Sequence, residues 1–298
     1  MSNSTNNESK PHAKRRGGVI TEATLTGLRA ALNGMTPREK GAEKAAQALD
    51  WMYRWGWTTS SVIATLAGTG RNSALAARLA KNGWAKRQPI RIVSSFHLTP
   101  TDILSITPEG VAELVALRGE LPFSRQGSVS KRVVKKNVTH DLLVQKLTLM
   151  YMGRWPGSEN EDLPEGYGPV TEFTTAHQLG EATLGEKIPD AIWCTESGHM
   201  LAIELELSPK YGRELDQFIK GHLDLQRRAT DPVDGLVTFF ASPDTAERYA
   251  RAMSVGRRVQ EWAYDKMRRE WWPLPNAPKI ELDANFITYE IVLPRAAR

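Results

Sequence analysis

The sequence predicts a protein of the α/β (α+β) class, in which a helix-rich N-terminal domain precedes a mixed sheet flanked by helices. From Glu43 onward, apolar residues recur at steps of three and four, which is typical of amphipathic helices. Between Ala191 and Leu207 two short apolar runs flank a turn, which is typical of a pair of strands. Helix-like and strand-like segments then alternate to the end of the chain. A length of 298 residues suggests about two domains.

Composition narrows the class of protein. The net charge of +5 fits a polyanionic partner and is also compatible with an ordinary soluble protein. Cys194 is the single cysteine, so one chain can form neither an internal disulfide nor a cysteine-based zinc site. No apolar run reaches the ~18 to 20 residues that cross a bilayer, and the polar start does not resemble a secretory signal. We therefore expect a cytoplasmic protein without membrane insertion.

The N-terminal part predicts a basic tail followed by a small domain. Residues 1–40 are rich in polar and basic residues and are expected to be a disordered basic tail. Residues 41–118 predict three helices, near 43–53, 59–67 and 72–82, then strands near 84–92 and 103–106 and a final helix near 111–117. Gly83 is expected to end the third helix in a left-handed conformation, and Thr107 to cap the last helix.

This order resembles a winged helix-turn-helix domain, and the run from Leu104 to Val111 resembles the strand-to-helix signature of many winged-helix regulators. The resemblance implies that the third helix enters the major groove of DNA while the wing lies on the backbone. The expected contacts are Arg71, Asn72, Ser73, Arg78 and Lys81 on the recognition element and Lys86, Arg87 and Arg91 on the wing. The alternative is a winged helix that contacts only protein.

Residues 119–138 predict a basic linker. Prolines, glycines and serines alternate there with basic residues. We expect the linker to follow a phosphate backbone through Lys131, Arg132, Lys135 and Lys136.

Residues 139–298 predict the mixed-sheet domain. Thr139 is expected to cap a helix that runs to Met152. Strands follow near 170–175, 191–195 and 200–207, the last two as a hairpin. A helix near 211–228, a strand near 235–241, a helix near 244–269 and a strand near 286–292 complete the pattern.

Three carboxylates lie on the predicted hairpin. Alternation along the second strand points Glu204 and Glu206 to one face, and Asp190 begins the neighbouring strand. Acidic residues are poor strand formers, and a hard divalent cation would relieve their repulsion. The sequence therefore predicts that Asp190 and Glu204 hold Mg²⁺ or Mn²⁺, with a cation from Lys210 or Lys187 nearby to stabilise developing charge.

The motif resembles the PD-(D/E)xK nuclease superfamily, which has a restriction-endonuclease-like core. Pro189 and Asp190 match its first half and Glu204 its second, whereas Glu206 stands where the superfamily usually places lysine, and Lys210 could substitute. These strings, with Thr-His-Asp-Leu-Leu-Val from Thr139, resemble the replication-relaxation family and the MobC class of mobilisation relaxases over about residues 42–245. The resemblance implies that His140 lies beside the acidic pocket.

The expected function is metal-dependent nicking or processing of double-stranded DNA, such as a plasmid origin. The protein would act in mobilisation or replication as a relaxase or as a relaxosome component beside other conjugation proteins. The expected catalytic set is Asp190, Glu204, Glu206, Lys210 and His140. One alternative is a noncatalytic DNA-binding regulator with a degenerate nuclease core, and another is an adaptor that binds protein through both domains.

Overall fold

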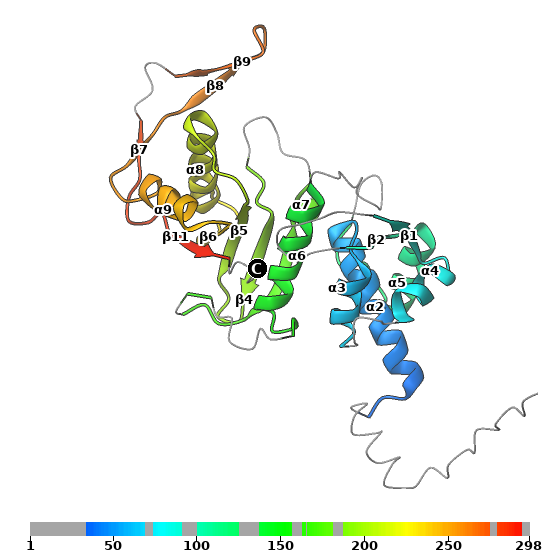
Figure 1. Cartoon of the computed structure of the whole chain (residues 1–298). Coiled ribbons are helices and arrows are strands. Elements are labelled where there is room, and N and C mark those ends of the chain that lie inside the picture. Colours follow the sequence, from blue (N-terminus) through cyan, green and yellow to red (C-terminus); the bar gives the residue numbers. More distant parts are fainter. Residues whose placement is uncertain are drawn as a thin grey trace, which may run out of the picture. The chain divides into compact units, whose positions relative to one another are not determined.

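The computed structural model describes residues 34–68, 74–90, 100–124, 137–156, 163–164, 166–180, 187–274 and 279–293. It has helices and a mixed sheet, as the predicted α/β class requires (Figure 1). Residues from Lys44 onward form one compact unit. Within the described ranges, every helix is too short or too polar to pass through a bilayer.

The first elements follow the predicted order. They are α2 (Pro37–Trp55), α3 (Ser60–Leu66), α4 (Ala74–Lys81), β1 (Ala85–Pro89), β2 (Asp102–Ile106) and α5 (Pro108–Arg118). Strands β1 and β2 pair in antiparallel fashion. Between the elements, one apolar core collects side chains that are almost fully buried: Leu49, Met52, Ile63, Leu79, Leu104 and Leu114.

The predicted turn chemistry is confirmed at both ends of this core. Gly83 follows α4 with a φ of 74°, a conformation that costs glycine little. Thr107 caps α5 by accepting a hydrogen bond from the Gly110 N–H, and its hydroxyl donates to the Gly83 carbonyl. A Cβ atom at Gly110 would lie 2.0 Å from the Trp84 carbonyl oxygen, so this close approach requires glycine.

The second part of the chain builds a five-stranded mixed sheet. Its strands are β3 (Val170–Thr175), β4 (Ala191–Thr195), β5 (Met200–Glu206), β6 (Gly235–Phe240) and β11 (Thr288–Val292), in the order β11-β6-β5-β4-β3. Strand β4 is antiparallel to its two neighbours β3 and β5, whereas β5, β6 and β11 run parallel. The predicted hairpin of β4 and β5 therefore lies inside the sheet, with β5 at its centre.

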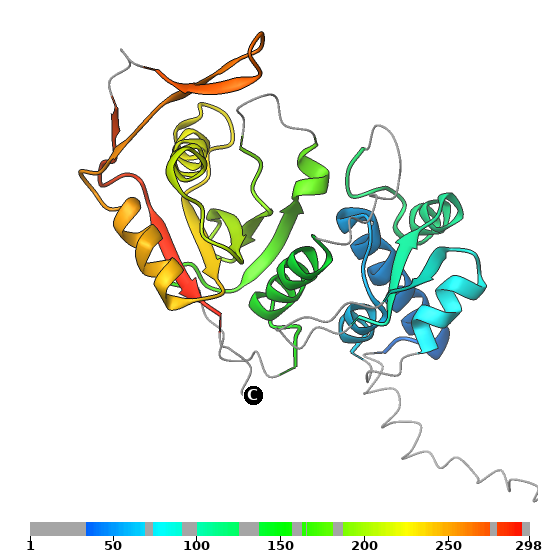
Figure 2. The same cartoon turned by 45° about the horizontal axis from the view of Figure 1, so that its top comes forward.

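Helices cover both faces of this sheet. Helix α6 (Val138–Tyr151) packs on the face that carries Ile203 and Leu205. Helices α8 (Gly212–Arg227) and α9 (Pro243–Ala252) share the other core with Ala202 (Figure 2). The short helix α7 (Ala176–Leu179) follows β3 directly.

Three predicted boundaries are wrong. Helix α2 begins at Pro37 and not near residue 43, so residues 37–40 of the predicted tail are helical. Helix α6 begins at Val138 with Asn137 at the N-cap, so Thr139 lies inside the first turn and does not cap it. The side chain of Val138 is only 1% exposed, so packing extends the helix backwards. The last strand begins at Thr288, because residues 283–287 form turns and irregular backbone.

The predicted helix over 244–269 is also wrong, because α9 ends at Ala252. Gly256, at a φ of 80°, interrupts the chain soon afterwards. The remaining residues form β7 (Arg258–Val259), β8 (Trp262–Asp265), β9 (Glu270–Pro273) and β10 (Ile280–Glu281). Aromatic residues favour strands, and Tyr264 lies opposite Trp271 across the β8–β9 hairpin.

A buried glutamine on α6 connects the first elements to the sheet domain. The Oε1 atom of Gln145 accepts from the Trp51 indole at 2.9 Å and from the Thr58 hydroxyl at 2.7 Å. Its amide nitrogen donates to the Trp57 carbonyl at 3.1 Å. Gln145 has an exposed fraction of 0%, so water cannot replace these bonds. One side chain of α6 therefore holds both helix α2 and the adjacent residues Trp57 and Thr58.

Replacing Gln145 by methionine keeps its length but removes all three hydrogen bonds. Because buried groups left without partners cost about 1 to 3 kcal/mol each, Gln145→Met should lower the free energy of unfolding by about 2 to 4 kcal/mol. Urea unfolding measures this change. The exposed Gln88→Met is the matched control and should stay within about 0.5 kcal/mol. A Gln145→Met protein as stable as the wild type would contradict this account.

Candidate acid–base site

The three predicted carboxylates lie at one end of β5. Glu204 and Glu206 point to the face covered by α8, as the alternation predicts, while Leu205 points into the core beneath α6. Both glutamates are buried, with exposed fractions of 2% and 5%. Asp190 precedes β4, and its N–H donates to the Ile203 carbonyl at 3.0 Å. Such burial requires a partner for each charge.

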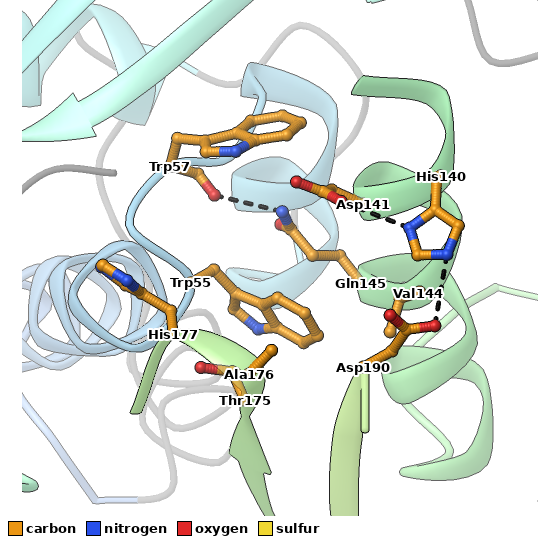
Figure 3. Close-up of a pocket in the computed structure, with 10 residues that line it drawn as sticks. All are labelled: Trp55, Trp57, His140, Asp141, Val144, Gln145, Thr175, Ala176, His177 and Asp190. Atoms are coloured by element: carbon orange, nitrogen blue, oxygen red, sulfur yellow. Dashed lines mark hydrogen bonds and ion pairs between the residues drawn. The ribbon is translucent and has the colours of Figure 1, made fainter. Parts of the chain in front are cut away.

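Asp190 is paired with His140 of α6. Its Oδ2 atom accepts the Leu205 N–H at 2.9 Å and lies 3.2 Å from His140 Nε2 (Figure 3). The same imidazole nitrogen lies 3.1 Å from the Leu205 carbonyl, and Nδ1 lies 3.3 Å from Asp141. Burial favours the neutral imidazole, but Asp141 and Asp190 outweigh it and raise the pKa of His140 to about 10. The His140 imidazolium therefore clamps Asp190 to β5.

Glu204 is paired with Lys187 and His222. Its Oε1 atom lies 2.7 Å from Lys187 Nζ and 3.2 Å from His222 Nε2, and neither contact has hydrogen-bond geometry. Burial would raise the pKa of Glu204, but the two bases outweigh it and lower that pKa to about 2. Burial lowers the pKa of His222, whose exposed fraction is 0%.

Lys187 reaches Glu204 because α8 presents a glycine where they meet. A Cβ atom at Gly221 would lie 2.4 Å from the Lys187 Cβ. Lys187 Nζ also lies 5.4 Å from the centre of the Phe218 ring, which supports the cation. Lys187 can therefore approach Glu204 because residue 221 of α8 has no side chain.

Lys210 instead pairs with Glu206. The two side chains form an ion pair at a spacing of four residues, and Lys210 Nζ lies 5.0 Å from the centre of the Phe218 ring. Burial and the repulsion of Lys187 lower the pKa of Lys210. The predicted substitute lysine therefore neutralises Glu206, and Lys187 is the lysine in contact with Glu204.

We call this set the acid–base cluster: Asp190, Glu204, Glu206, His140, Lys187, Lys210 and His222. Sequence reasoning did not find His222. The helical repeat of 3.6 residues could have indicated it, because His222 lies four residues after Phe218 on the inward face of α8.

The residues as arranged do not fit the expected Mg²⁺ or Mn²⁺. Carboxylate oxygens are suitable ligands, but Glu204 is already neutralised by Lys187 and contacted by His222. Asp190 is neutralised by His140 and accepts a backbone N–H. Among the described residues, no three His, Cys, Asp or Glu side chains come close enough together to hold a metal ion. Metal binding would require Lys187 to leave Glu204.

A small cavity lies beside His140 and Asp190 (Figure 3). Trp55, Trp57, Thr175 and His177 contribute to its walls. Its volume of about 50 Å³ suits a few water molecules and is too small for a nucleobase.

The predicted DNA contacts divide into three groups. Arg78 and Lys81 on α4 and Lys86 on β1 are exposed. Arg87 is engaged by the buried Asp102, with Nε 2.6 Å from Oδ2. The remaining predicted contacts lie outside the described residues: Arg71, Asn72, Ser73, Arg91, Lys131, Arg132, Lys135 and Lys136.

The pKa of Glu204 makes the stability of the fold depend on pH. A carboxylate with a folded pKa of about 2 and an ordinary value of 4.5 contributes stability above pH 4.5, which is lost as the pH falls towards 2. Glu204→Gln should therefore be less stable than the wild type at pH 6.5, and the gap should narrow by about 1 kcal/mol at pH 4.0. Urea unfolding at the two pH values measures it.

The control for this prediction is Glu281→Gln, which removes an exposed ion pair with Arg258. Its stability should differ from the wild type by less than about 1 kcal/mol at both pH values. A gap for Glu204→Gln that is independent of pH would show that the carboxylate does not contribute in its charged form.

The chain matches no protein-family model, no curated protein and no solved structure. Its function is therefore inferred from its own residues and their geometry.

Proposed function

We propose that the protein binds double-stranded DNA and acts in the mobilisation or replication of a plasmid or another mobile element, as a relaxosome component. The acid–base cluster is the observation that supports this most directly. It gathers the residues of the Pro-Asp and Glu motif, with a lysine against Glu204, at one end of the β4–β5 hairpin in a mixed sheet. A restriction-endonuclease-like core has this hairpin and this kind of sheet.

The N-terminal elements support the DNA-binding part of the proposal. Their order, three helices, two antiparallel strands and a final helix, is the order of a winged helix-turn-helix domain. In such a domain α4 would enter the major groove and β1 would belong to the wing. Exposed Arg78, Lys81 and Lys86 on these elements suit phosphate contacts.

The geometry of the cluster favours a noncatalytic core. Glu204 lies 2.7 Å from Lys187, and Asp190 is held by the Leu205 N–H and by His140. Carboxylates neutralised in this way attract a second cation only weakly. We therefore infer that the protein binds DNA through a winged helix and uses the nuclease-like core as a structural or protein-binding part of a relaxosome.

DNA binding is tested in the full chain with the triple variant Arg78→Gln, Lys81→Gln and Lys86→Gln. Fluorescence anisotropy with a labelled duplex of arbitrary sequence should show at least tenfold weaker binding. The slope of log affinity against log salt should fall by up to about 3, because each lost phosphate contact removes about 0.9. The control changes three exposed basic residues of the β8–β9 turn: Lys266→Gln, Arg268→Gln and Arg269→Gln. Equal affinities for the wild type and the first variant would contradict winged-helix binding.

Metal-dependent nicking is the second candidate function. One observation favours it: Asp190 keeps a side chain that is 23% exposed, beside a lysine that already reaches Glu204. A substrate that drew Lys187 away would leave the Glu204 carboxylate without that partner, near the partly exposed Asp190.

Supercoiled plasmid with Mg²⁺ or Mn²⁺ distinguishes the two candidates. With a noncatalytic core we expect no nicking by the wild type and no increase in melting temperature on adding either metal. Nicking that Asp190→Asn and Glu204→Gln abolish, with duplex affinity unchanged, would overturn that expectation. Lys187→Met and Lys210→Met would then show which lysine serves the reaction, since Lys187 contacts Glu204 and Lys210 contacts Glu206.

A further inference from the structure

A second recess, on the surface of the sheet domain, has a different character from the small cavity. It is a groove of about 800 Å³ between the start of α8 and helix α9. Its walls include Tyr211, Leu215, Glu247, Arg248, Arg251 and Arg257. This volume lies in the range of sites that hold a ligand of several hundred daltons. Sequence reasoning assigned no role to any of these residues.

The charge of the groove favours an anion. Three arginines line the groove, and Glu247 is the single acidic residue among its lining residues. Arg251 lies 3.6 Å from Glu247, but both side chains are at least 70% exposed, so this pair is weak in water. The guanidinium groups therefore remain able to bind phosphate, for which their planar donors are well suited.

The groove also has an exposed aromatic ring. Tyr211 is 58% exposed, and the Arg248 guanidinium lies 4.2 Å from the centre of its ring. This cation–π contact holds the ring in place at the edge of the groove. Exposed aromatic side chains among basic residues form the surfaces on which bases of single-stranded nucleic acid stack.

The position of Tyr211 is fixed relative to the acid–base cluster. The Lys210 N–H donates to the hydroxyl of Tyr249 at 3.2 Å, and Tyr249 on α9 is fully buried. Lys210 in turn pairs with Glu206 of the cluster. The groove thus begins one residue from the end of the predicted nuclease motif.

We propose that this groove binds a segment of single-stranded DNA. The phosphates would contact Arg248, Arg251 and Arg257, and one unpaired base would stack on Tyr211. A duplex keeps its base faces covered, so the exposed ring favours a single strand. The proposal rests on the proposed DNA function and adds a second DNA surface to it, on the sheet domain beside the cluster.

The full chain and a fluorescein-labelled oligothymidylate test this site. The triple variant Arg248→Gln, Arg251→Gln and Arg257→Gln should bind at least tenfold more weakly. Its salt slope should fall by about 2, because each phosphate contact on a single strand contributes about 0.7. The three substitutions in the β8–β9 turn are the matched control and should leave the affinity for oligothymidylate within about twofold.

Substitutions at Tyr211 distinguish base stacking from electrostatic attraction to the arginines. Tyr211→Ala should weaken oligothymidylate binding about 5- to 100-fold and leave duplex affinity unchanged, whereas Tyr211→Phe should bind like the wild type. Tyr211 makes no side-chain cap to α8, so its loss should not unfold the helix. Unfolding in urea checks that each variant is folded.

Several results would overturn the single-strand site. They are equal losses in the groove and control variants, unchanged binding by Tyr211→Ala, or competition by polyglutamate as strong as that by oligothymidylate. If the wild type binds duplex but not oligothymidylate, only this site fails. If the wild type binds no DNA of either kind, the proposed function itself fails.

Discussion

The burial of Glu204 is the constraint on which the rest of the sheet domain depends. A carboxylate with 2% exposure at the centre of a sheet requires compensating polar or charged groups, and the chain supplies them from two directions. Lys187 arrives from the segment before β4, and His222 arrives from α8. Gly221 leaves the space that Lys187 needs. One charge therefore determines how the β4–β5 hairpin and α8 pack together.

On the other face of the β4–β5 hairpin, polar contacts tie helix α6 to the same strand. His140 on α6 contacts both Asp190 and the Leu205 carbonyl, so the helix is tied to the same strand that carries Glu204. One turn further along α6, Gln145 binds Trp51, Trp57 and Thr58. Helix α6 thus connects the acid–base cluster to the first elements through buried polar groups. In a low dielectric such bonds are costly to break, which makes the arrangement specific.

The cluster and the groove suggest a division of labour in DNA binding. In the acid–base cluster, the buried charge of Glu204 is balanced by Lys187. The groove, in contrast, is open to solvent and lined by arginines. Phosphate would therefore be attracted to the groove, and the acidic residues would remain shielded by their own bases.

The amount that could be predicted from sequence differs between fold and site. Local patterns were sufficient for α3, α4, α5 and the β4–β5 hairpin, because caps such as Thr107 and turns such as Gly83 act within a few residues. They were misleading beyond Ala252, where Gly256 and the aromatic pairs across β8 and β9 replaced a predicted helix. Helical and strand periods are hard to distinguish in short segments that are rich in aromatic residues.

By itself, the sequence determined the strand face shared by Glu204 and Glu206, since alternation along a strand is a local property. Only the tertiary structure decided which base meets which acid. Lys187 and His222 are far from Glu204 in the chain, and Lys187 reaches Glu204 because Gly221 of α8 leaves it space. The physical reason is that an ion pair is set by distance and burial in space, which the spacing of residues along the chain does not contain.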